Sequence, residues 1–196
     1  MSTVLYGFFG EDRGQRVFLA AYLEQCGIEA LNISFKPVIY FGKKFGPTNN
    51  NVVDRLCADA CREAYVIGYP KLHWLFIGRD VDSYESARYE KLRSRLQASI
   101  PEKWQNRVLL MLPVQCIEHW LLYLAQYPER TALERRPNDQ TKDAVYADTA
   151  HGKDKIVSDL LATLTPERIS WLAEVSPSFR AFHTQVQAYL DTLEAA

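Results

Sequence analysis

Four short, continuous apolar runs alternate with segments whose apolar residues recur every three or four positions, from the start of the chain to about residue 127. Such runs, bounded by Gly, Pro and acidic residues, are typical of strands, and the recurring spacing indicates one buried face of a helix. Because the runs lack polar alternation, each strand should be covered on both faces, as in a parallel sheet. The runs are residues 4–9, 33–41 (with Pro37 inside), 73–78 and 107–113.

The strand–helix alternation predicts an α/β fold with a doubly wound, mainly parallel, four-stranded sheet over residues 1–127. The intervening helices are expected at residues 17–26 (ended by Gly27), from about 51, at 84–100 and at 117–127. Residues 128–196 are expected to be a helical extension packed on this core. Within it, the polar segment 128–152 is predicted as a long loop. Helices should then begin near Lys153, at Thr165-Pro166 and at Ser176-Pro177, where a capping hydroxyl precedes proline.

Bulk properties exclude several classes of protein. The 196 residues suit one domain, and 23 basic against 24 acidic residues leave no overall charge that would attract nucleic acid. The four cysteines lie among apolar neighbours without a second pair or a nearby histidine, which favours buried free thiols in a reducing cytoplasm. The sequence shows neither a signal-peptide pattern nor an apolar run long enough to span a membrane.

Acidic residues follow two of the predicted strands directly. Glu11 comes after the first strand, and Asp80 and Asp82 come after the third. In a parallel sheet, ligands bind beyond the carboxyl ends of the strands, so these loops converge if the two strands are neighbours. In an extended segment, residues two apart point to the same side. Three carboxylates suit Mg²⁺ or Mn²⁺, and we predict a metal site, the alternative being acids that simply end strands at solvent.

The order of these motifs resembles the Toprim domain of topoisomerases, primases and OLD-type nucleases. More narrowly, residues 11–19 (Glu-Asp-Arg-Gly-Gln-Arg-Val-Phe-Leu) resemble the opening of small stand-alone, RloB-like Toprim proteins. Residues 77–82 match their Asp-x-Asp strand end, and residues 117–122 and 176–182 resemble two of their helices. Two positions depart from that pattern: Asp12 stands where such proteins carry Gly, and Gln15 where they carry a second Glu.

This resemblance implies a nuclease that hydrolyses RNA or DNA with Mg²⁺ or Mn²⁺, acting as an effector of prokaryotic anti-phage defence. Asp80 and Asp82 would hold the metal, and Glu11 would be a ligand or the general acid/base. Glu118 would point to the same pocket, or else only favour its helix dipole. The resemblance also implies an ABC-type ATPase partner; the chain itself has no phosphate-binding loop of the Gly-x-x-x-x-Gly-Lys-Ser/Thr type with which to hydrolyse ATP.

Basic residues near the acids are candidates for substrate contacts. Arg79 is predicted to contact phosphate or to pair with Asp80. Lys153 is predicted to contact phosphate, and loop lysines such as Lys43 and Lys44 offer further contacts; the alternative for each of these lysines is a plain surface residue. His119 and the four tryptophans are interpreted as packed side chains. Rival readings are a receiver-like phosphoacceptor, a nucleotide-sugar transferase and a catalytically silent binding or regulatory subunit. The choice between RNA and DNA, and self-association, stay open.

Overall fold

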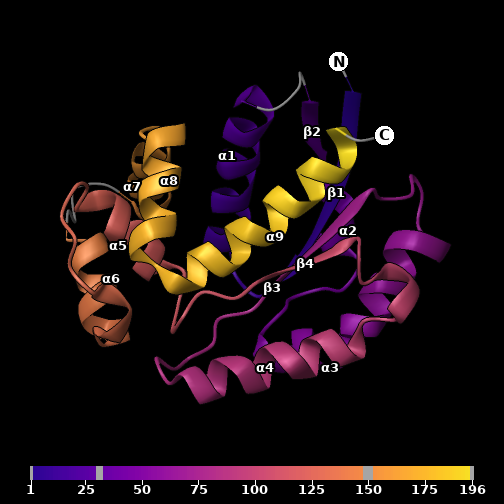
Figure 1. Ribbon diagram of the computed structural model, residues 1–196. Coiled ribbons are helices and arrows are strands. Elements are labelled where there is room, and N and C mark those ends of the chain that lie inside the picture. The colour runs from indigo at the N-terminus through magenta and orange to yellow at the C-terminus, as the bar shows by residue number, and fades with distance from the viewer. Residues whose placement is uncertain (1, 30–32, 148–151, 195–196) are drawn as a thin grey trace.

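The computed structural model describes residues 2–29, 33–147 and 152–194. Its centre is a four-stranded, all-parallel sheet in the order β2-β1-β3-β4. Helices cover both faces of this sheet, with α3 and α4 on one side and α1 and α9 on the other (Figure 1). The predicted α/β fold with a parallel sheet is therefore confirmed. The strands are β1 (Ser2–Gly10), β2 (Ile33–Pro37), β3 (Trp74–Gly78) and β4 (Val108–Met111).

Successive residues of each strand enter two separate hydrophobic cores. In β3, for example, Trp74 and Phe76 belong to the first core, whereas Leu75 and Ile77 belong to the second. This period of two is the reason that an uninterrupted apolar run marks a strand buried on both faces. The first core lies under α1 (Arg13–Glu29), α5 (Glu118–Ala125) and the C-terminal helices; the second lies under α3 (Asn50–Arg62) and α4 (Ser86–Ser99).

The predicted strand over residues 33–41 is wrong in its second half. β2 ends at Pro37, and residues from Ile39 form the short helix α2 (Ile39–Lys43). Val38 still donates a hydrogen bond to the Tyr6 carbonyl at 2.8 Å, but the chain then leaves the sheet edge. Phe41 reaches the second core from this helix, so an apolar run is buried here without a strand. The predicted end of α1 at Gly27 is also wrong, since the helix continues to Glu29.

The segment after α5 is more ordered than predicted. The expected long loop contains the short helix α6 (Asn138–Val145), preceded by the 3-10 turn η3 (Leu133–Arg135). Buried Thr141 and Val145 hold α6 against the molecule. Three further helices follow and begin where expected, with Thr165 and Ser176 accepting capping hydrogen bonds from Arg168 and Phe179. They are α7 (Lys153–Leu161), α8 (Pro166–Val175) and α9 (Pro177–Glu194).

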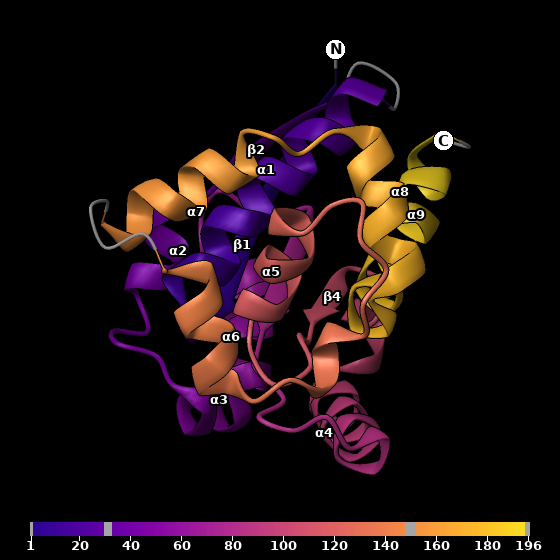
Figure 2. The same ribbon diagram turned by 90° about the vertical axis from the view of Figure 1, so that its left-hand side faces the viewer.

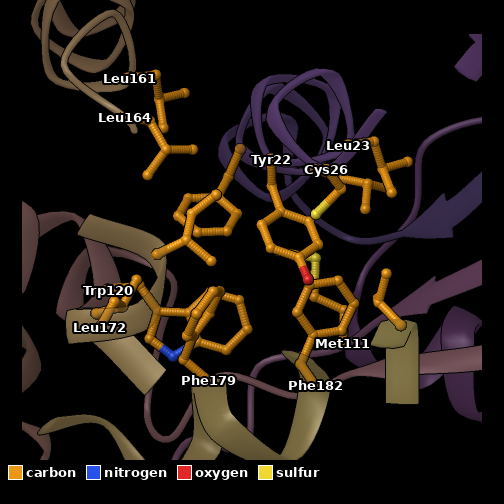
Figure 3. Packing of buried hydrophobic residues seen from close by; sticks show 14 of the residues in the cluster. Tyr22, Leu23, Cys26, Met111, Trp120, Leu161, Leu164, Leu172, Phe179 and Phe182 are labelled. Carbon is orange, nitrogen blue, oxygen red and sulfur yellow. The ribbon is translucent and has the colours of Figure 1, made fainter. Parts of the chain in front are cut away.

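An aromatic cluster joins the two helices that carry the late motifs of the sequence. Trp120 of α5 packs against Phe179 of α9 with ring centroids 5.1 Å apart, and Tyr22 of α1 closes the group against Phe182 (Figure 3). The indole N–H of Trp120 donates to the Ser178 hydroxyl at 2.8 Å. Within the described residues, no helix is both long enough and apolar enough to cross a membrane.

Candidate metal centre

The loop that follows β1 meets the loop that follows β3, because these two strands are hydrogen-bonded neighbours. Their register pairs Gly10 with Gly78, so both strands end at the same level of the sheet. The next residues are consequently in contact: Glu11 Oε1 accepts a hydrogen bond from the Asp80 backbone N–H at 2.6 Å. The predicted convergence of these strand ends is confirmed, and β1 and β3 bring the first two predicted ligands together.

Gln15 of α1 contacts the Asp80 carboxylate. Its side chain is fully buried, and Nε2 donates to Asp80 Oδ1 at 2.6 Å. Gly78 makes room for it, because a Cβ atom at that position would lie 2.3 Å from Gln15 Oε1. Burial, together with the negative charge of Glu11, raises the pKa of Asp80 well above its usual range. Burial is likewise the main reason that the pKa of Glu11 is raised.

A second pair of acids lies beside the first. Asp12 caps α1 by accepting from the Gly14 N–H at 2.7 Å, and its pKa is raised by burial and by the charge of Glu118. Glu118, only 8% exposed, opens α5 and accepts a hydrogen bond from the Tyr146 hydroxyl at 3.3 Å. Its other oxygen, Oε2, is buried without a hydrogen-bond partner among the described residues. A buried acceptor of this kind can take a hydrogen bond from a water or a ligand bound at the site.

Lys142 of α6 supplies positive charge to this group of acids. Burial by itself would lower the pKa of Lys142, but the surrounding charges raise it overall, and Glu118 is the strongest of them. Asp80 and Asp12 act on it in the same direction. We name Glu11, Asp12, Asp80 and Glu118 the carboxylate cluster. α6 lies beside α5, the helix that begins at Glu118 (Figure 2).

Asp82 has different partners. The chain runs beside the segment that follows β4: the Val81 N–H donates to the Pro113 carbonyl at 3.0 Å, and the Asp82 N–H donates to the Gln115 carbonyl at 3.1 Å. At Asp82, φ is 56°, a left-handed conformation, so the extended geometry expected for this segment is wrong at that residue. Its Oδ2 accepts from Asn50 at 2.5 Å and from Arg79 at 3.0 Å. Its assignment as a metal ligand stays a prediction.

The donor set fits a hard, hydrated cation. Within the described part of the chain, no three carboxylate, imidazole or thiol side chains are arranged to enclose an ion by themselves. Mg²⁺ asks for less than that, because it keeps several waters and takes one or two carboxylates together with substrate phosphate. Glu11 and Asp80, which are joined by the hydrogen bond from the Asp80 N–H, are the residues that could hold such an ion, and the unpartnered oxygen of Glu118 could accept from one of its waters.

The two predicted phosphate-binding residues differ in their surroundings. Arg79 is turned inward: its side chain is 12% exposed and lies 3.5 Å from Asp54 and 3.0 Å from Asp82. It therefore fixes carboxylates instead of facing solvent. Lys153 is exposed at the first turn of α7, with Nζ 4.8 Å from the ring centre of Tyr146. It thus stands next to the residue that hydrogen-bonds Glu118.

Packed side chains account for the remaining motif residues. His119 is fully buried, where Nε2 lies 2.9 Å from the Arg136 carbonyl, and burial lowers its pKa. Trp74, Trp120 and Trp171 are buried as expected. All four cysteines are buried, as the sequence predicts.

Sequence reasoning missed Lys142 and Tyr146 as members of the site. Both come from the segment expected to be a loop, and Tyr146 directly follows the last turn of α6. A charge pattern was the one available signal, since Lys142 follows Asp139 by three positions as in an ordinary surface helix. That signal does not distinguish a lysine in a site from one at solvent.

The raised pKa values predict a stability that depends on pH in metal-free protein. The folded state favours protonated Asp80, so its stabilising effect is present below the ordinary Asp pKa of about 3.9 and is lost as pH rises through the raised folded value. Asp80→Asn cannot ionise, so its melting temperature in EDTA should exceed that of the unmodified protein by an amount that grows with pH. Thermal unfolding between pH 4 and 8 measures this. A difference that stays constant, or shrinks, would contradict the raised pKa.

Comparison with protein-family models, with curated proteins and with solved structures finds no match. The resemblance to Toprim-like proteins therefore rests on the motifs in residues 11–19, 77–82, 117–122 and 176–182 and on their order along the chain.

Proposed function

We propose that this protein is a metal-dependent nuclease with a Toprim-like fold, which hydrolyses phosphodiester bonds in RNA or DNA. The observation that supports this most is the carboxylate cluster at the carboxyl ends of β1 and β3. Its acids come from two strand ends and the start of α5, where burial, and after it the charge of the neighbouring acids, raises the pKa values of Asp80 and Asp12. Acidic residues whose ionised form is made this unfavourable are typical of sites that bind a cation or transfer protons.

The residues of the site would have two roles, which are to hold the metal ion and to transfer protons. Asp80 and Glu11 would hold Mg²⁺ or Mn²⁺, which when bound polarises a phosphate and activates water. Asp12, whose pKa is raised, is suited to accept a proton, and Glu11 would take this role instead if it does not ligate the metal. Lys142 and the exposed Lys153 are placed to attract the substrate backbone.

A catalytically silent binding subunit is the second candidate, and the hydrogen bonds around the acids favour it. Gln15 already donates to Asp80, and Asn50 and Arg79 already donate to Asp82. Gln15 stands where the resembling proteins carry an acid. Such a protein would bind nucleic acid at the cluster without cleaving it.

A cleavage assay separates the two candidates. With Mg²⁺ or Mn²⁺, the purified protein is expected to shorten end-labelled RNA or DNA oligonucleotides, and EDTA should stop the reaction. Binding of the labelled strand without cleavage in either metal would favour the silent subunit. Cleavage that continues unchanged in EDTA would contradict the metal-dependent mechanism.

An ABC-type ATPase partner and a role in anti-phage defence are part of the proposal by resemblance alone. Such a partner would supply the ATP hydrolysis for which this chain has no phosphate-binding loop. Co-purification from the source cells tests it: recovery of the protein without any ATPase would count against this part, and leave the nuclease proposal standing.

A further inference from the structure

A pocket of about 830 Å³ opens beside the carboxylate cluster. It lies between α1, α2 and the loop of residues 46–48, over the end of β1. Glu11 and Asp12 line it directly, so the pocket and the cluster share a wall. Its volume is within the range of roughly 300–1,000 Å³ that is usual for sites of small organic groups.

The wall is apolar and comes from three separate elements. Phe8 of β1, Val17 of α1 and Val38 with Ile39 at the start of α2 all contribute. Ile39 is 67% exposed, although it is a large aliphatic residue beside a pocket. An apolar recess that stays open to solvent is suited to a flat, weakly polar group of a ligand.

In contrast to its apolar wall, the pocket has basic residues at its rim. Exposed Arg13, Arg16 and Lys43 line the pocket around the two carboxylates. Arg13 is also paired with Asp154 of α7 at 2.9 Å, which leaves Arg16 and Lys43 as exposed cations with no ion pair among the described residues. A ligand that matches the whole pocket therefore combines an apolar part with negative charge close to it.

We infer that the pocket takes an unpaired nucleobase of single-stranded nucleic acid, next to the phosphate that lies at the carboxylate cluster. The inference rests on the proposed nuclease function and narrows its substrate class. A base offers apolar faces, and the phosphates that flank it match the basic rim. In a duplex the base is stacked and paired, and would have to leave the helix before entering such a pocket.

A charge-neutral block of the pocket tests this inference. Ala20 is exposed on α1 and lines the pocket, so Ala20→Trp fills it without altering the charge. Affinity for a nuclease-resistant, single-stranded phosphorothioate oligonucleotide in Mg²⁺ should fall at least about tenfold, the effect of losing one stacked base. Affinity for the same strand made entirely of abasic nucleotides should not change. Ala58→Trp is the matched control, because Ala58 is exposed on α3 and does not line the pocket.

Two results would overturn the inference: equal affinity of Ala20→Trp and the unmodified protein for the ordinary strand, or an equal loss for ordinary and abasic strands. Ile39→Asn repeats the test from α2 should Ala20→Trp fail to fold. The two proposals fail separately. If the protein cleaves nucleic acid but Ala20→Trp does not lower its affinity for the ordinary strand, the base pocket is refuted and the nuclease proposal stands. If the protein binds ordinary strands more tightly than abasic ones but never cleaves them, the nuclease proposal is refuted.

Discussion

Replacing Asp80 by asparagine is expected to lower metal-dependent cleavage of nucleic acid by roughly a thousandfold, because the site loses a negative charge where the cation is held. Asparagine is the informative replacement. Its side-chain oxygen still accepts the hydrogen bond that Gln15 donates, and the Asp80 backbone N–H still donates to Glu11. Geometry is thus retained while charge is removed. Initial rates on an end-labelled oligonucleotide, with Mg²⁺ in excess, measure the effect.

The control is Asp59→Asn, which removes the same charge from an exposed position on α3. It should cleave at the unmodified rate. Thermal unfolding of both proteins in the assay buffer separates loss of chemistry from loss of fold, and Asp80→Asn is expected to remain folded at the assay temperature. Cleavage by Asp80→Asn at the unmodified rate would remove Asp80 from the site and with it the nuclease proposal.

The sheet and the meeting of the acids were predictable because they follow from periodicity. Continuous apolar runs are typical of strands that are buried on both faces, as in a parallel sheet, and such a sheet places the carboxyl ends of its strands on one edge. Glu11 and Asp80 are accordingly in contact. The conformation of Asp82 was not predictable, because it depends on donors from Asn50 and Arg79. Asn50 belongs to a helix far away in the sequence.

Burial also explains why the second half of the site escaped prediction. α6 is eight residues long and polar, and it is held by a few side chains such as Thr141, whose hydroxyl lies 3.1 Å from His119. Helices this short gain their stability from tertiary packing and not from local propensity. Lys142 reaches the carboxylate cluster from that helix. Its role depends on contacts that no local pattern encodes.

Gln15 shows how a departure from a motif is resolved by structure. In the sequence it stands where the resembling proteins carry an acid. In the fold it is a buried amide that orients Asp80, and Gly78 leaves the space for it. An acid at position 15 would add a further negative charge beside Asp80, whose pKa is already raised well above its usual range. The amide therefore lowers the repulsion within the site while keeping Asp80 in place.

Trp120 lies in the motif that follows β4, and its replacement by alanine is expected to lower the free energy of unfolding by about 3–5 kcal/mol. Its side chain is fully buried among Phe18, Phe179 and Phe182, with ring centroids 5.2, 5.1 and 5.8 Å away. Truncation leaves a cavity between α1, α5 and α9 that these rings cannot fill. Denaturant unfolding, compared at equal pH, measures the loss.

Two companion variants separate packing from hydrogen bonding. Trp120→Phe keeps an aromatic ring but removes the N–H that donates to Ser178, so about 1–2 kcal/mol should be lost. Trp104→Ala should also cost less than Trp120→Ala, because Trp104 is half-buried at the edge of the second core, 5.5 Å from Tyr65. If Trp120→Ala proved no more costly than Trp104→Ala, the aromatic cluster would not be what joins α5 to α9. The motif of residues 117–122 would then have no role in packing, and the chemistry of Glu118 would be the remaining explanation for it.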